Sequence, residues 1–148
     1  MRAIVVGLVA FGMVFAGAAE GAIPRVHNPA LRSVVANAFQ SVKYDVNGMD
    51  SCKGCTESAQ AVYEDTAAGE KSLNALPDYS GATFAAYLNA FKALQFYSRF
   101  ALAYADSYIS AQNGGSNAGD FHLALTYLKQ ARGFATRADE ALSIRTLP

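Results

Sequence analysis

The spacing of apolar residues along this chain is helical almost throughout. Apolar side chains recur at intervals of three and four residues, and the alternation that is typical of a strand is not sustained in the sequence. Alanine is abundant, and glycine and proline fall between the periodic stretches, where they end helices. The pattern predicts an all-α protein in which four helices account for nearly the whole chain after the N-terminal segment.

The expected helices cover residues 28–48, 55–76, 81–113 and 120–142. Asn28 is a good N-cap, and Pro29 then occupies the first helical position, where its missing N–H costs nothing. Gly69, inside the second helix, indicates either a close approach between helices or a weak point. Because the connections are short, the simplest assembly is an antiparallel four-helix bundle with a long, aromatic-rich third helix. A tandem array of helical hairpins is the alternative, although no repeat of about 34 residues is visible.

The first 18 residues have the features of an export signal. Met1 and Arg2 give a short positive start, an uncharged apolar run follows, and Ala16, Gly17 and Ala18 fit the small-x-small pattern of a cleavage site. A retained membrane anchor is the alternative, although the run is short for a span of about 20 residues. We therefore expect a signal peptide over residues 1–18 and one helical-bundle domain over residues 19–148. The expected location is the periplasm, the extracellular space or an organelle lumen, with membrane anchoring only if the signal is retained.

The charge balance argues against some classes of partner. The chain has 12 basic and 12 acidic residues, so its formal net charge is zero. No basic patch of the kind that binds nucleic acid is visible, and we expect no nucleic-acid partner. With 52% hydrophobic residues, the chain is also too apolar to be disordered.

The third helix carries more aromatic residues than one buried face requires. Its expected core stripe consists of Phe84, Tyr87, Leu88, Phe91, Leu94, Leu102 and Ile109. A second set of aromatic residues projects to roughly the opposite side, with Tyr108 at its rim: Phe96, Tyr97, Phe100 and Tyr104. Two explanations stay open. Another segment can cover this second face, which would make it ordinary core, or the face can be a docking surface, because tyrosine and phenylalanine contribute strongly to interfaces.

The two cysteines, Cys52 and Cys55, lie three residues apart at the start of the second helix. A structural disulfide is the favoured prediction, because residues at this spacing in a helical turn lie within the Cα separation that a disulfide accepts. A thiol-disulfide redox site is the alternative, but the strand and βαβ framework of thioredoxin-like enzymes are missing. Haem attachment would need a histidine directly after Cys55, where the chain has Thr56. Zinc would need His27 and His122 as further ligands, and these come from separate segments. We expect no metal site.

The sequence offers no recognisable catalytic motif, and we expect neither a catalytic residue nor a cofactor. The leading hypothesis is a non-enzymatic exported bundle that acts as a structural or docking subunit of a larger complex. It would bind a protein partner, with a membrane complex or a second copy of the chain as the options, through Phe96, Tyr97, Phe100, Tyr104 and Tyr108. The alternatives are a CxxC thiol-disulfide redox protein and a carrier of a hydrophobic ligand or pigment.

Overall fold

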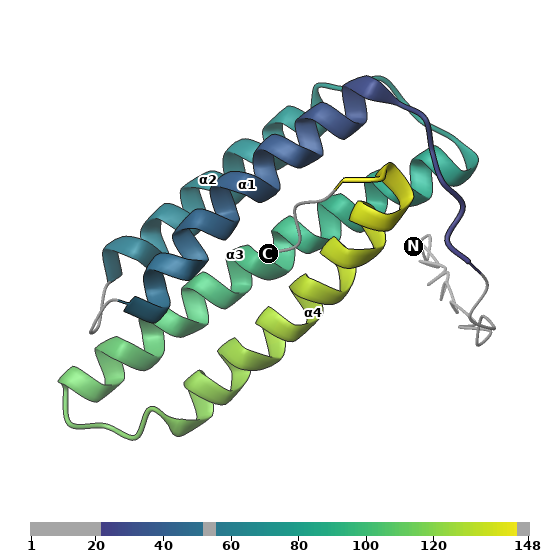
Figure 1. The fold of residues 1–148 in the computed structure, drawn as a ribbon. Helices are drawn as coiled ribbons and strands as arrows, with labels where there is room; N and C mark the ends of the chain where they lie inside the picture. The colour runs from purple at the N-terminus through teal and green to yellow at the C-terminus, as the bar shows by residue number, and fades with distance from the viewer. Residues whose placement is uncertain (1–21, 52–55, 145–148) are drawn as a thin grey trace, which may run out of the picture.

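The protein is all-helical in the computed structural model, which describes residues 22–51 and 56–144 (Figure 1). Its helices are α1 (Pro29–Ser51), α2 (Thr56–Asn74), α3 (Gly81–Gln112) and α4 (Ala118–Leu142). The described residues contain no strand. The predicted all-α fold with a long third helix is therefore confirmed. The predicted signal segment, residues 1–18, lies outside the described residues.

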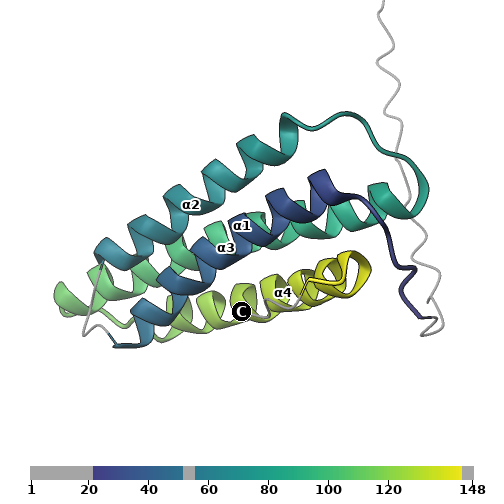
Figure 2. The same cartoon turned by 45° about the horizontal axis from the view of Figure 1, so that its top comes forward.

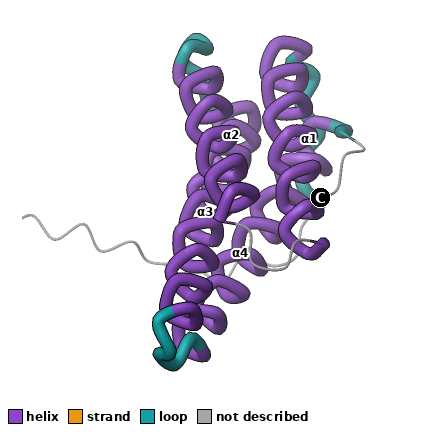
Figure 3. The backbone as a smooth tube through the Cα atoms, turned by 90° about the vertical axis from the view of Figure 1, so that its left-hand side faces the viewer, coloured by secondary structure: helices purple, strands orange, loops and turns teal. Residues whose placement is uncertain are grey.

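The four helices lie side by side, and consecutive helices run in opposite directions (Figures 1 and 2). Helix α3 holds the assembly together, because it packs along α4 and also along α2. Helix α1 packs mainly on α2 and touches α3 only briefly. The turn that joins α3 to α4 extends beyond the α1–α2 pair (Figures 1 and 3).

Most of the buried residues of α3 and α4 are alanines. The buried residues of α4 include Ala124, Ala131, Ala135, Ala138 and Ala141. Those of α3 include Ala86, Ala90, Ala93, Ala101 and Ala103. Because an alanine side chain ends at its Cβ, two such faces allow the helix backbones to approach closely, which explains why this helix pair makes the most extensive contact.

The helix ends agree with the sequence in some places and differ in others. Asn28 caps α1 as predicted, since its Oδ1 accepts a hydrogen bond of 2.9 Å from the Leu31 N–H. The predicted end of this helix near Gly48 was wrong, because the helix continues and buries Met49 in the core. The predicted cap at Asp120 was also wrong. Helix α4 begins two residues earlier, and Asp120 lies in its first turn, where a carboxylate is stabilised by the helix dipole.

Gly69 marks a close approach of three helices. A Cβ atom built on Gly69 would lie 2.9 Å from Leu94 Cδ1 of α3 and 3.0 Å from Ala38 Cβ of α1. The first of two explanations offered by the sequence, a close helix approach, is therefore confirmed. A side chain at this position would force α1 or α3 away from α2.

Residues 22–28, which we call the N-terminal strap, lie beside the end of α4 (Figure 1). The Val26 N–H donates a hydrogen bond of 2.7 Å to the Ala141 carbonyl oxygen, and Ile23 and Val26 pack against the core. Helix α4 ends at Ser143, which adopts a left-handed conformation with φ of 53°. The Ile144 N–H then bonds back to the Asp139 carbonyl, so that both ends of the described chain are tied to the last turn of α4.

None of the helices that the structure describes is long and apolar enough to cross a membrane.

Candidate functional site

The aromatic face predicted for docking lies largely in the core. Tyr97 is fully buried and Phe100 is 4% exposed, whereas Phe96, Tyr104 and Tyr108 are half-buried. The expectation that these residues form an exposed second face of α3 was therefore wrong for Tyr97 and Phe100. The reason is that alanines share the Tyr97 side of α3, and this alanine-rich side packs against the neighbouring helices.

Two half-buried members of that set, Phe96 and Tyr104, pack against α4. The Phe96 ring stacks on Phe134, with centroids 5.6 Å apart and an interplanar angle of 4°. The Tyr104 ring lies between Phe100 and Phe121, at centroid distances of 5.9 and 6.4 Å. The structure thus distributes these rings along the α3–α4 contact and does not gather them into one exposed patch.

The predicted core stripe of α3 lies only partly in the core. Of its seven residues only Leu94 is fully buried, while Tyr87, Leu88 and Phe91 are half-buried. Phe84, Leu102 and Ile109 are exposed at 45%, 52% and 48% of their surface. We call these three residues the outer apolar strip. The prediction that this stripe is core was therefore wrong for the three strip residues, which are the exposed large hydrophobic residues of α3.

Two polar side chains are buried together without hydrogen-bond partners. Tyr97 of α3 is fully buried, and Asp139 of α4 is 2% exposed. Neither the Tyr97 hydroxyl nor the two Asp139 carboxylate oxygens have a hydrogen-bond partner among the described residues. The two groups lie close enough that the Asp139 charge contributes to raising the pKa of Tyr97.

Burial dominates the ionisation of this pair. It raises the pKa of Asp139 to about 7, although the positive charge of Lys43 on α1 acts in the opposite direction. It also raises the pKa of the Tyr97 hydroxyl well above its usual value, an effect that Arg132 opposes. The helical period could have indicated Asp139, because it follows Ala131 and Ala135 on the apolar side of α4, at a spacing of four residues from Ala135.

A second acidic pair lies between α1 and α2. Burial raises the pKa of Asp45, and a hydrogen bond of its protonated carboxyl group to Asp65 and the repulsion between the two groups raise it further. Burial also raises the pKa of Glu70 on α2. Within the described part of the chain, no three histidine, cysteine or acidic side chains are placed so that they could hold a metal ion.

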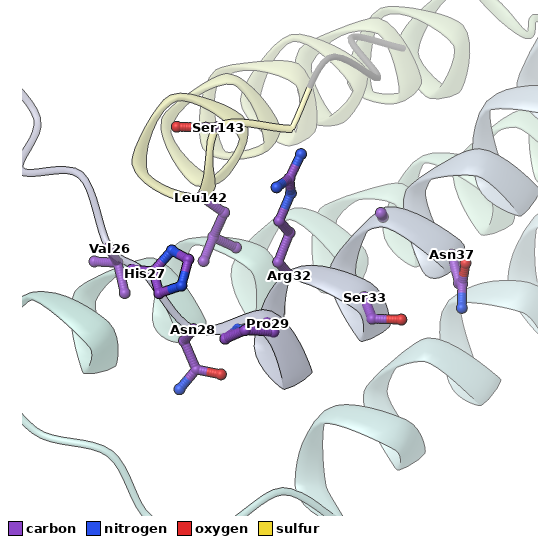
Figure 4. A pocket seen from close by; sticks show the side chains of 10 residues that line it. Val26, His27, Asn28, Pro29, Arg32, Ser33, Asn37, Leu142 and Ser143 are labelled. Atoms are coloured by element: carbon purple, nitrogen blue, oxygen red, sulfur yellow. The ribbon is translucent and has the colours of Figure 1, made fainter.

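A cavity of about 340 Å³ opens between the N-terminal strap, the first turns of α1 and the end of α4 (Figure 4). His27 and Asn28 line it from the strap, Arg32 extends from α1 towards the end of α4, and Leu142 supplies an apolar wall. His27 is the first of the two histidines considered as a zinc ligand. The other, His122, lies in the first turn of α4 and therefore at the opposite end of that helix.

The disulfide predicted between the two cysteines remains a prediction. Cys52 and Cys55 lie outside the described residues, between the end of α1 and the start of α2.

Comparison with known proteins adds no family to this description, since no family model, curated protein or solved structure matches the chain.

Proposed function

We propose that this protein is a non-enzymatic docking module, an exported four-helix bundle that binds a protein partner through the outer apolar strip of α3. The observation that carries the proposal is the exposure of Phe84, Leu102 and Ile109 on the longest helix. Export is inferred from the charge and apolar pattern of residues 1–18. The proposal keeps the predicted helix and moves the binding face to its other side.

The three strip residues point in nearly the same direction. Phe84 and Leu102 are 18 residues apart, which is five helical turns, and Ile109 follows seven residues later. A rigid helix therefore presents them as one line along its length. Large apolar side chains that are held in this way suit recognition by a groove or by another helix, in which a few buried anchors dominate the affinity.

A site-specific photo-crosslinker tests the proposal in the cells that make the protein. We expect a crosslinker at Leu102 to give a covalent adduct of defined mass, because this position would lie inside the interface. The matched control is Leu125, a leucine of α4 with 47% exposure, which should give no such adduct. An adduct of twice the chain mass would identify a second copy as the partner, and a larger or smaller adduct would identify another protein.

Polar substitutions then measure the contribution of the strip. The double variant Leu102→Ser with Ile109→Ser should keep its helical circular dichroism, since both side chains are half exposed, and should lose at least tenfold in association. Equal adducts at Leu102 and Leu125, or undiminished association of the double variant, would refute the proposed binding face.

A further inference from the structure

A second cavity lies at the α2–α3 connection and is lined by aromatic rings. It has a volume of about 330 Å³, within the range of small-molecule sites. Its wall comes from the end of α2, from residues 76–79 of the connection and from the start of α3. We call it the aromatic pocket, and its lining residues used below are Asn74, Asp78, Tyr79, Phe84 and Tyr87.

Three rings surround this space. Tyr87 is the shared neighbour, with its ring centroid 6.1 Å from that of Tyr79 and 6.2 Å from that of Phe84. Tyr79 is tilted by 58° to Tyr87, whereas Phe84 is nearly parallel to it at 19°. At these separations one cation can lie within about 6 Å of more than one ring centroid, which is the range of a cation–π interaction.

The charge of the pocket favours the same class of ligand. Asp78 is an exposed carboxylate at the wall, and none of the described residues that line the cavity is basic. Aromatic faces are the negative ends of their quadrupoles, so rings and carboxylate attract a cation together. An anionic ligand would meet repulsion from both.

The central ring is held in place before any ligand arrives. The Tyr87 hydroxyl donates a hydrogen bond of 3.1 Å to Asn74 Oδ1, which ties α3 to the end of α2. Phe91 lies against Tyr87 from the next turn of α3, at a centroid distance of 6.0 Å and an angle of 17°. A preformed ring wall costs less ordering on binding than a flexible one.

We propose that the aromatic pocket binds a small organic cation with an apolar shell, that is, a quaternary or methylated ammonium group. Such a cation carries its charge at low desolvation cost and presents methyl groups to the aromatic lining. The group can belong to a free metabolite or to a lipid headgroup. This inference does not depend on the docking function, and the test uses Tyr87 and Asp78, which are not part of the outer apolar strip.

The direct test compares choline with its neutral isostere, 3,3-dimethyl-1-butanol, which has the same shape and lacks the charge. In a titration followed by amide chemical shifts, we expect choline to shift residues 76–87 and to bind at least tenfold more tightly than the isostere. Equal affinities would refute a cation–π site, and so would choline shifts confined to another part of the protein. This comparison uses the unmodified protein and is independent of how any variant folds.

Variants assign the binding to the rings and the carboxylate. Tyr87→Leu should weaken choline binding at least tenfold, and Asp78→Asn should weaken it about two- to fivefold. Tyr79→Phe keeps the ring and should bind as before. Tyr63→Leu, which removes an exposed tyrosine from α2, is the matched control and should also bind as before. An unchanged affinity of both Tyr87→Leu and Asp78→Asn would overturn the assignment.

A vesicle arm separates the two sources of the cation. If the protein sediments with phosphatidylcholine vesicles but not with phosphatidylglycerol vesicles, the cation is a lipid headgroup. Choline binding without sedimentation would identify a free small molecule. Failure of choline to bind would refute the proposal in either case.

Discussion

The carboxyl group of Asp139 is buried between the helices, and neither of its oxygens has a hydrogen-bond partner among the described residues. The Lys43 charge on α1 acts on Asp139, and the Arg132 charge on α4 acts on its neighbour Tyr97 of α3. Burial raises the pKa of Asp139 to about 7, so that the folded protein retains a proton that the unfolded chain loses near pH 4.

The stability of the protein should therefore fall as the pH rises. The contribution of Asp139 to the free energy of unfolding is fully present below about pH 4, decreases between pH 4 and pH 7, and is lost above the folded pKa. The total loss of stability is on the order of 2–4 kcal/mol. Asp139→Asn should flatten this slope and be more stable than the wild type at pH 8 by about 1–3 kcal/mol. Urea unfolding at several pH values measures both effects.

Glu140→Gln is the control for this experiment, because it removes the same charge from an exposed neighbour and should keep the wild-type slope. If Asp139→Asn retained the full slope, the pH dependence would come from other groups, such as Asp45 and Glu70, whose pKa values burial also raises.

Gly69 allows a different prediction at the scale of a single residue. Gly69→Ala should lower the free energy of unfolding by about 1–3 kcal/mol, because the new Cβ would press on Leu94 and Ala38 and this strain exceeds the gain in helix propensity. Gly133→Ala in α4 is the matched control. A Cβ there meets no atom within 4 Å, so the change should stabilise by about 0.5–1 kcal/mol. Similar effects of both substitutions would contradict the close approach at Gly69.

At the scale of the element, the end of α4 carries backbone strain. Ser143 has φ of 53° and ψ of 40°, a left-handed conformation that disfavours residues with a Cβ. Ser143→Gly should raise the free energy of unfolding by about 0.5–1 kcal/mol, since glycine adopts this conformation without strain. Thermal unfolding measures the gain. Ser98→Gly inside α3 should instead destabilise by about 1 kcal/mol, and a loss of stability in both variants would show that Ser143 is not strained.

The existence and order of the helices could be predicted from the sequence, but the inward face of α3 could not. Three- and four-residue spacing defines a helix without showing which of two apolar sides meets the neighbours. The prediction gave the inward side to large residues such as Phe84 and Leu102. The structure gives it to a side with Tyr97 and several alanines, because small residues allow the close contact with α4.

At the scale of the whole molecule, both candidate sites depend on relations between elements. The outer apolar strip is exposed because α2 and α4 pack on other sides of α3. The aromatic pocket exists because the α2–α3 connection brings Tyr79 next to Tyr87 and because Asn74 on α2 fixes the Tyr87 hydroxyl. The sequence could indicate that α3 had surplus aromatic rings. It could not show these placements, since they are set by how the connection folds back.

The burial of Tyr97 also gives the molecule an internal spectroscopic reporter. The chain has no tryptophan, and the Tyr97 hydroxyl cannot readily lose its proton while the helices enclose it. In alkaline solution we therefore expect Tyr97 to convert to tyrosinate only when α3 and α4 separate. Comparing the alkaline titration of the wild type with that of Tyr97→Phe would thus report the separation of these two helices without an added dye.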